Sequence, residues 1–130
     1  MAHHRRVVTA LTAPAAVGPY SHAVASNGLL FCSGQVPLDP QSGELSGTTP
    51  GEQTRRCLEN LSLVAAAGGA TLADAVRMTI YVIDMAAFAE VNEVYGGYFP
   101  EEPPARVTIG VAALPLGAQV EIDAVIALPD

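Results

Sequence analysis

The sequence predicts an α+β fold, in which a single mixed β-sheet carries two α-helices, most economically on the same face. Two observations lead to this class. Segments of strand-like and helix-like periodicity follow one another as three strands, a helix, a strand, a helix and two strands. Half of the residues are hydrophobic and only 15% are charged, as expected of a chain that buries a core. Residues 1–130 are therefore expected to form a single domain.

The first three strands are predicted in the N-terminal part of the chain. The apolar segment Arg6–Ala10 is short. A secretory signal needs about 7–15 apolar residues, so we expect a strand here and a cytoplasmic protein. Asn27 and Gly28 are the residues that a type I′ turn favours, and they predict a β-hairpin within residues 22–35. Gly34, in the second strand of this hairpin, predicts a bulge or a close backbone approach.

The two predicted helices have recognisable ends. Thr49 and Glu52 form a capping box, and the two glycines at 68–69 end the first helix. Asp84 is placed to cap the second helix. The apolar stripe of the second helix consists of Phe88, Val91, Tyr95 and Phe99.

Alternation predicts the remaining strands and their two faces. Residues 75–83 form a strand that points Val76, Met78, Ile80 and Val82 to one side. Residues 105–125 are expected to form a final hairpin. In its second strand Val120 and Ile122 face one side, whereas Glu121 faces the other side.

The side of the sheet that Glu121 occupies, here called the open face, is expected to include Arg106, Thr108 and Gly110 as well. Most of its other residues are Ala, Val, Thr, Ile and Tyr, so this face is less charged than a solvated sheet face should be. Two helices on one side cannot cover it. Self-association through the sheet is the simplest cover.

Arg106 and Glu121 are the charged residues that this cover would bury, and two interpretations are open. They could pair with each other across the interface and fix the assembly. Alternatively, the Arg106 guanidinium could bind a small carboxylate through two parallel hydrogen bonds while Glu121 handles a proton or a water molecule.

Other polar residues carry weaker signals. The Ser33 hydroxyl lies in a strand, where it commonly has a backbone partner, and a catalytic triad of Ser33 or Ser21 with His22 lacks a nucleophile elbow. Asn92, beside the apolar stripe of the second helix, is either a structural anchor or the edge of a site. Glu90 looks like solvated charge.

Composition excludes several classes of function. The chain has no lysine, which removes Schiff-base and phosphate-loop lysine mechanisms. Its net charge of −7 and scattered arginines argue against a nucleic-acid partner, and no apolar run is long enough to span a membrane. The histidines show no metal-ligand spacing, so we expect no metal. Cys32 and Cys57 are expected to be buried and unpaired.

Five segments together resemble the Rid family, a group known for reactive enamine and imine deaminases. They are "GPYSHAV", "GLLFCSGQVPLDPQSGEL", "EQTRRCLENL", "DMAAFAEVNEVYGGYFP" and "PPARVTIGVAALPLGAQVEIDAVI". The resemblance implies a chorismate-mutase-like α+β fold and a homotrimer with its sheets packed centrally and an active site in each cleft between subunits. It also implies hydrolysis of 2-imino acids to 2-keto acids and ammonia, without metal or cofactor.

The resemblance also implies roles for individual residues. Arg106 takes the place of the arginine that binds the substrate carboxylate, and Glu121 that of the glutamate that positions water. The remaining positions that line the family's pocket are Tyr20, Ser33, Gly34 and Asn92. Thr108 stands where the family often has cysteine and His22 where it frequently has glutamine, so the preferred substrate side chain stays open.

Three alternatives remain at this point. The chain could be a specialised relative that acts on another imine or enamine acid, such as an aminomuconate. It could be a non-catalytic, ligand-binding or chaperone-like trimer, against which the presence of Arg106 and Glu121 argues. A ribonuclease or translation inhibitor, a role also attached to the family, fits the acidic composition least.

Overall fold

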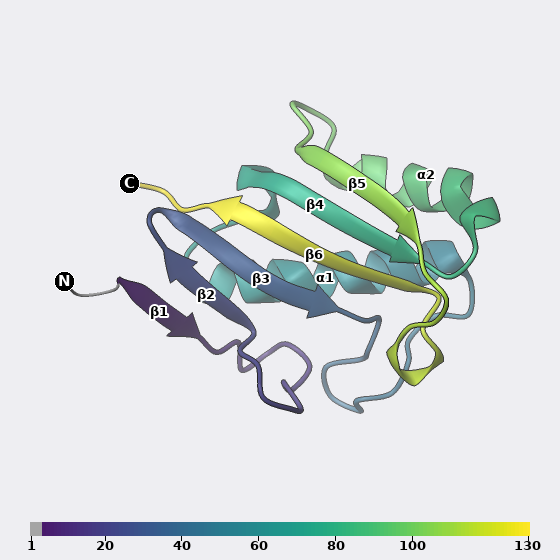
Figure 1. Ribbon diagram of the computed structural model, residues 1–130, viewed down its shortest axis with the longest axis horizontal. Coiled ribbons are helices and arrows are strands. Elements are labelled where there is room, and N and C mark those ends of the chain that lie inside the picture. Colours follow the sequence, from purple (N-terminus) through teal and green to yellow (C-terminus); the bar gives the residue numbers. More distant parts are fainter. Residues whose placement is uncertain (1–3) are drawn as a thin grey trace.

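The computed structural model describes residues 4–130 as one six-stranded sheet backed by two helices (Figure 1). The predicted domain also includes residues 1–3, which lie outside the described residues. The strands are β1 (Arg5–Val8), β2 (Ala23–Ser26), β3 (Leu29–Gln35), β4 (Ala75–Val82), β5 (Ala105–Gly110) and β6 (Val120–Ala127). The helices are α1 (Pro50–Ala67) and α2 (Phe88–Tyr98), with short 3₁₀ turns η1 (Leu72–Asp74), η2 (Met85–Ala87) and η3 (Pro115–Gly117).

The strand order is β1-β2-β3-β6-β4-β5, and only the β4–β5 pair is parallel. Figure 1 shows both helices behind the sheet, α1 behind β3 and β6 and α2 towards β4 and β5. The predicted class, a mixed sheet with two helices on one face, is confirmed. Neither helix in the described range 4–130 is long and apolar enough to cross a bilayer.

The predicted N-terminal hairpin is present as β2 and β3. Asn27 and Gly28 have φ angles of 51° and 77°, the two left-handed positions that a type I′ turn requires. The pairing of β3 with β6 shifts register between Cys32 and Gln35, which confirms the irregularity predicted at Gly34. The first strand, β1, is two residues shorter at its end than predicted.

Helix α1 begins at the predicted capping box. The Thr49 side chain accepts a hydrogen bond from the Glu52 backbone N–H, and the Glu52 carboxylate accepts one from the Thr49 N–H in return. The Glu90 carboxylate of α2 also accepts a hydrogen bond of 2.6 Å from the Gly51 N–H. Glu90 is therefore not only solvated charge, because it caps the N-terminus of the neighbouring helix.

Helix α2 differs from its prediction at both its start and its stripe. The Asp84 side chain caps η2 by accepting from the Ala86 N–H, and α2 itself starts only at Phe88. Val91, Tyr95 and Phe99 are buried as expected, whereas Phe88 is partly exposed. The 3₁₀ turn takes up the residues between the end of β4 and the helix.

Strand β4 carries one correction to the predicted alternation. Met78, Ile80 and Val82 are fully buried against the helices, but Val76 is 44% exposed. The pairing of β4 with β6 shifts register between Ala75 and Arg77, so a bulge turns Val76 away from the core.

The predicted final hairpin is wrong. Strands β5 and β6 do not pair with each other, because β4 lies between them. Every second residue of β6 is fully buried, so the strand takes a central place in the sheet, while β5 lies at the edge. The connection through η3 crosses the width of one strand (Figure 1).

The predicted position of Arg106 on the open face is also wrong. Arg106 and Thr108 stand opposite Met78 and Ile80 of β4, whose side chains face the helices. Glu121 stands opposite Tyr81, on the open face. The prediction paired β5 directly with β6, and this false register placed Arg106, Thr108 and Gly110 on the wrong side.

Candidate functional site

A cavity of about 760 Å³ opens on the open face, at the end of β3 and the start of β6. Four predicted site residues line it: Tyr20, Ser33, Gly34 and Glu121. The rest of its wall is mostly apolar and comes from the loop before β2, the loop after β3 and the η3 turn, through Pro14, Ala15, Val17, Val36, Leu38, Gly43, Pro115 and Leu116. An apolar cavity with few polar groups is the usual form of a small-molecule site.

Glu121 is the acidic group of this cavity. It is half-buried, and the loss of hydration raises the pKa of its carboxyl, with Asp123 on the same strand adding repulsion. Asp123 is held in place by the Tyr81 hydroxyl, which donates a hydrogen bond of 2.8 Å to it. A carboxyl group with a raised pKa in a cavity is suited to accept and return a proton.

Ser33 and His22 shape the cavity through the backbone. The Ser33 hydroxyl donates to the Ser21 carbonyl oxygen at 2.6 Å, the satisfied backbone role that the sequence suggested. His22 is buried; its Nδ1 accepts from the Ala10 N–H at 3.0 Å, so its Nε2–H donates to the Pro14 carbonyl oxygen at 2.8 Å. His22 therefore fixes the loop that carries Pro14 into the cavity wall.

Arg106 belongs to a second cluster, on the helix side of the sheet. Its Nη1 donates a hydrogen bond of 2.6 Å to the Asn92 side-chain oxygen on α2. Its Cζ lies 5.6 Å from the centre of the Phe88 ring and 5.1 Å from that of Tyr95. The guanidinium stays exposed at the sheet edge, with donors available for a ligand.

Two hydroxyl oxygens near Arg106 are buried without a hydrogen-bond partner among residues 4–130. They are the Thr108 Oγ1, on the same face of β5 as Arg106, and the Tyr95 Oη. Unpaired buried hydroxyls are uncommon in folded proteins.

The structure therefore divides the seven predicted site residues into two groups. Tyr20, Ser33, Gly34 and Glu121 share the cavity, whereas Asn92, Arg106 and Thr108 lie on the opposite side of the sheet. Within one chain the two charged residues cannot act on one small molecule.

Sequence reasoning missed the partners of both charged residues. Phe88 and Tyr95 were assigned only to the core, although their spacing from Asn92 places all three on one face of a helix. Tyr81 and Asp123 lie on different strands, and only the pairing of β4 with β6 brings them together.

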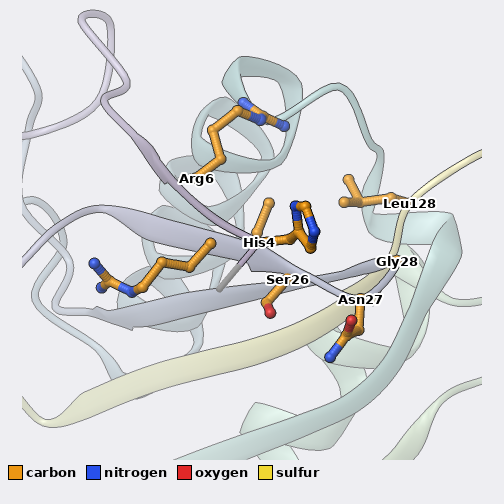
Figure 2. Close-up of a pocket in the computed structure, with 8 residues that line it drawn as sticks. His4, Arg6, Ser26, Asn27, Gly28 and Leu128 are labelled. Carbon is orange, nitrogen blue, oxygen red and sulfur yellow. The ribbon is translucent and has the colours of Figure 1, made fainter. Parts of the chain in front are cut away.

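A second, more open hollow of about 400 Å³ lies at the far edge of the sheet, between β1 and the β2–β3 turn. Figure 2 shows His4 beside Ser26 and Asn27, with Arg6 extending away towards the end of α1. There the Arg6 Nη2 lies 3.5 Å from the Gly68 carbonyl oxygen. None of the predicted site residues lines this hollow.

Within the described part of the chain, no group of three or more His, Cys, Asp or Glu side chains is placed to hold a metal ion. Cys32 and Cys57 are buried free cysteines, and burial raises the pKa of the Cys32 thiol to about 12. Thiols in such surroundings are unreactive.

A family model described as "Endoribonuclease L-PSP" matches residues 10–128. The chain belongs to this family. The resemblance to the Rid family is confirmed as well, since similar proteins carry deaminase names and a similar crystal structure is that of a RidA protein. The matched range includes both groups of site residues.

Similar proteins carry more than one name. A RutC family protein of Sinorhizobium fredii is 48% identical over 116 residues, which cover 89% of this chain and 92% of that protein. A "2-iminobutanoate/2-iminopropanoate deaminase" of Mus musculus is 43% identical over 121 residues, covering 93% and 90%. The crystal structure of E. coli TdcF with bound serine is similar to this chain, with a TM-score of 0.88 at 33% identity, covering 95% and 99%.

Proposed function

We propose that this protein hydrolyses reactive 2-imino acids, and the enamines that tautomerise to them, to 2-keto acids and ammonia. The observation that carries the proposal is an exposed arginine with free N–H donors on one side of the sheet and a half-buried glutamate in a mostly apolar cavity on the other. Deaminase names among relatives at 43% identity support the reaction class.

The two groups of residues can act together only if a second copy of the chain supplies one of them. The open face presents the exposed apolar side chains of Phe31, Val107 and Ile109 on the same side of the sheet as Glu121. We infer that three copies pack through these faces, so that Arg106 at the edge of one sheet reaches the Glu121 cavity of its neighbour. Each chain then contributes to two sites.

The chemistry follows from the residues. Arg106 binds the substrate carboxylate through two N–H donors, which orients the C=N carbon. Glu121 accepts a proton from a water molecule as the water oxygen bonds to that carbon, giving a carbinolamine. Glu121 returns this proton to the imine nitrogen, which becomes an amine. Glu121 then moves the hydroxyl proton of the carbinolamine to the same nitrogen, the C–N bond breaks as the C=O bond forms, and ammonia leaves a 2-keto acid behind. The imine is already electrophilic, so positioning and proton transfer suffice.

The first test is direct. A pyridoxal-phosphate-dependent dehydratase acting on threonine generates 2-iminobutyrate in situ, and the rate of 2-ketobutyrate release is measured with and without this protein. We expect the protein to accelerate release beyond the spontaneous rate. A rate equal to the spontaneous one, for imino acids of several side chains, would contradict the proposed function and favour a binding role.

Mixed assemblies test the shared site. The variants Arg106→Ala and Glu121→Gln are each expected to lose about tenfold or more of the activity when tested alone. In a ring of three, every mixed assembly contains one junction at which an intact Arg106 meets an intact Glu121. An equal random mixture should therefore recover about a quarter of the wild-type rate. No recovery in mixed assemblies verified by mass would show that the two residues do not act at one shared site.

A further inference from the structure

The surroundings of Arg106 on α2 carry an inference about how its guanidinium is held. Phe88, Asn92 and Tyr95 are spaced i, i+4 and i+7 along α2, so they form one stripe of the helix. All three contact Arg106: Asn92 through a hydrogen bond, and the two aromatic rings through their faces. A flexible, exposed side chain at a sheet edge thus meets three partners on one face of α2.

The hydrogen bond and the ring contacts differ in whether they occupy an N–H donor of Arg106. An arginine carries five N–H donors in one plane, and the Asn92 oxygen takes one of them at 2.6 Å. Aromatic rings attract the guanidinium through its positive charge and occupy no in-plane donor. The rings therefore restrict the orientation of the guanidinium, while its remaining N–H donors stay available for a carboxylate.

We propose that Phe88 and Tyr95 are positioning residues, which hold the Arg106 guanidinium in the orientation that accepts the substrate carboxylate. The proposal rests on the proposed function, because it assigns the carboxylate as the ligand of Arg106. Because the guanidinium is already held in place before the carboxylate binds, less conformational entropy is lost on binding. The ring faces act on Arg106, and the Tyr95 hydroxyl plays no part.

The hydroxyl and the ring of Tyr95 can be removed separately, which provides a control for the role of the ring. Its side chain is 5% exposed, its ring packs against Phe99 with centres 4.8 Å apart, and its Oη has no hydrogen-bond partner among the described residues. Tyr95→Phe removes an unpaired buried hydroxyl and keeps the ring, so it should leave stability unchanged or raise it. Tyr95→Leu removes the ring. At the exposed position 88, Phe88→Tyr likewise keeps the ring and Phe88→Leu removes it.

The first experiment measures the kinetics of 2-iminobutyrate hydrolysis for these four variants. We expect Tyr95→Phe and Phe88→Tyr to keep the wild-type KM, and each leucine variant to raise KM by about three- to tenfold with a smaller change in kcat. Val91→Ala, buried on the same helix, controls for lost packing and should lower stability without changing KM. Leucine variants with a wild-type KM would overturn the proposal.

A double-variant comparison separates positioning of Arg106 from direct contact with substrate. In an Arg106→Ala background, Tyr95→Leu and Phe88→Leu should cause no further rise in KM, because the residue on which they act is gone. A further rise of the same size would show that the rings touch the substrate themselves, and it would overturn the positioning role.

A spectroscopic readout keeps this inference distinct from the proposed function. The chain has six arginines, and Arg106→Lys identifies the Nε–H signal of Arg106 in ¹⁵N NMR spectra. We expect ring currents to move that signal away from those of freely mobile arginines by the same amount in the wild type and in Tyr95→Phe, and by less in Tyr95→Leu, which keeps only the Phe88 ring. This result would stand even if hydrolysis failed. An Arg106 signal at the position of mobile arginines in the wild type would overturn the proposal.

Discussion

Gly34 lies so close to Glu121 that a Cβ atom at residue 34 would overlap the Glu121 carboxylate. Because φ at Gly34 is not in the left-handed region, the backbone itself could accept alanine. The Glu121 carboxylate on β6 can therefore occupy its position only because residue 34 on β3 has no side chain.

Gly34→Ala should displace the Glu121 carboxylate and leave the fold intact. A displacement of about 1 Å at a reacting group can cost roughly a hundredfold in rate, so we expect a kcat loss approaching that size. The measurement is 2-iminobutyrate hydrolysis together with the melting temperature. Gly96→Ala, in α2 with open space around it, is the matched control and should be active. An active Gly34→Ala enzyme would contradict the assigned position of Glu121.

Substitution of Arg106 and Glu121 should separate catalysis from assembly. Arg106→Ala removes charge-assisted hydrogen bonds worth roughly 1.5–3 kcal/mol, or about one to two decades in kcat/KM, and Arg106→Lys should lose less. Glu121→Gln removes the proton acceptor, for a loss on the order of 10²–10⁴. The check is activity and mass in solution for each variant. If the two residues only hold subunits together, activity will instead follow the amount of assembly that remains.

The pH profile should respond to Asp123. Burial and the Asp123 charge raise the pKa of Glu121, and hydrolysis needs its carboxylate form, so the rate should fall as pH drops through that raised pKa. Asp123→Asn removes the repulsion, lowers the pKa of Glu121 and should move the acid limb of kcat/KM to lower pH. Tyr81 and the buried Cys57 also interact with the Glu121 charge, and Tyr20 lines the same cavity.

Tyr81→Phe provides the graded comparison. The Tyr81 hydroxyl donates a hydrogen bond to Asp123, and Tyr81→Phe removes this bond but keeps the Asp123 side chain, so the variant should move the acid limb by less than Asp123→Asn does. Acid limbs that coincide in the wild type and both variants would rule out the influence of Asp123.

His22 should matter for stability and for the cavity wall. His22→Ala leaves the Ala10 N–H and the Pro14 carbonyl without their partner, at a cost of about 1–3 kcal/mol for each unpaired group, and it should raise KM as the loop loosens. His22→Gln offers both an acceptor and a donor and should retain most of the stability. Urea unfolding and KM check this; equal losses for both variants would contradict a hydrogen-bonding role.

The assembly should depend on the open face. Sedimentation of the wild type at micromolar concentration should give the mass of three chains. Ile109 is 46% exposed in the single chain, so Ile109→Asp should leave each chain folded, while a buried unpaired charge would prevent assembly. Ile109→Val is the conservative control and should assemble. A wild-type mass of one chain would refute the trimer.

Features set by neighbouring residues in the sequence were predictable. The Asn27-Gly28 turn and the Thr49 capping box require only a few adjacent residues, and both formed as expected. Strand order requires a comparison of distant segments, and the compact sequence between Arg106 and Glu121 suggested a hairpin that the insertion of β4 prevents.

The same limit applied to the site. The alternation within β5 correctly places Arg106 and Val107 on opposite sides of the sheet. It does not show which of these two side chains points towards the helices. That choice is set by the Asn92 oxygen and the Phe88 and Tyr95 rings, which make the helix side acceptable for a charge at the sheet edge. The identity of the site residues is a local property of the sequence, whereas their grouping depends on the tertiary fold.

The placement of Arg106 and Glu121 on opposite faces of one sheet has an evolutionary consequence. If the site forms between copies, a duplicated gene could lose the arginine in one product and the glutamate in the other, and the pair would still build a working site in a mixed ring. Each product alone would then look like a degenerate enzyme. Divergence of this kind would make activity depend on co-expression of two paralogues, without a single new catalytic residue.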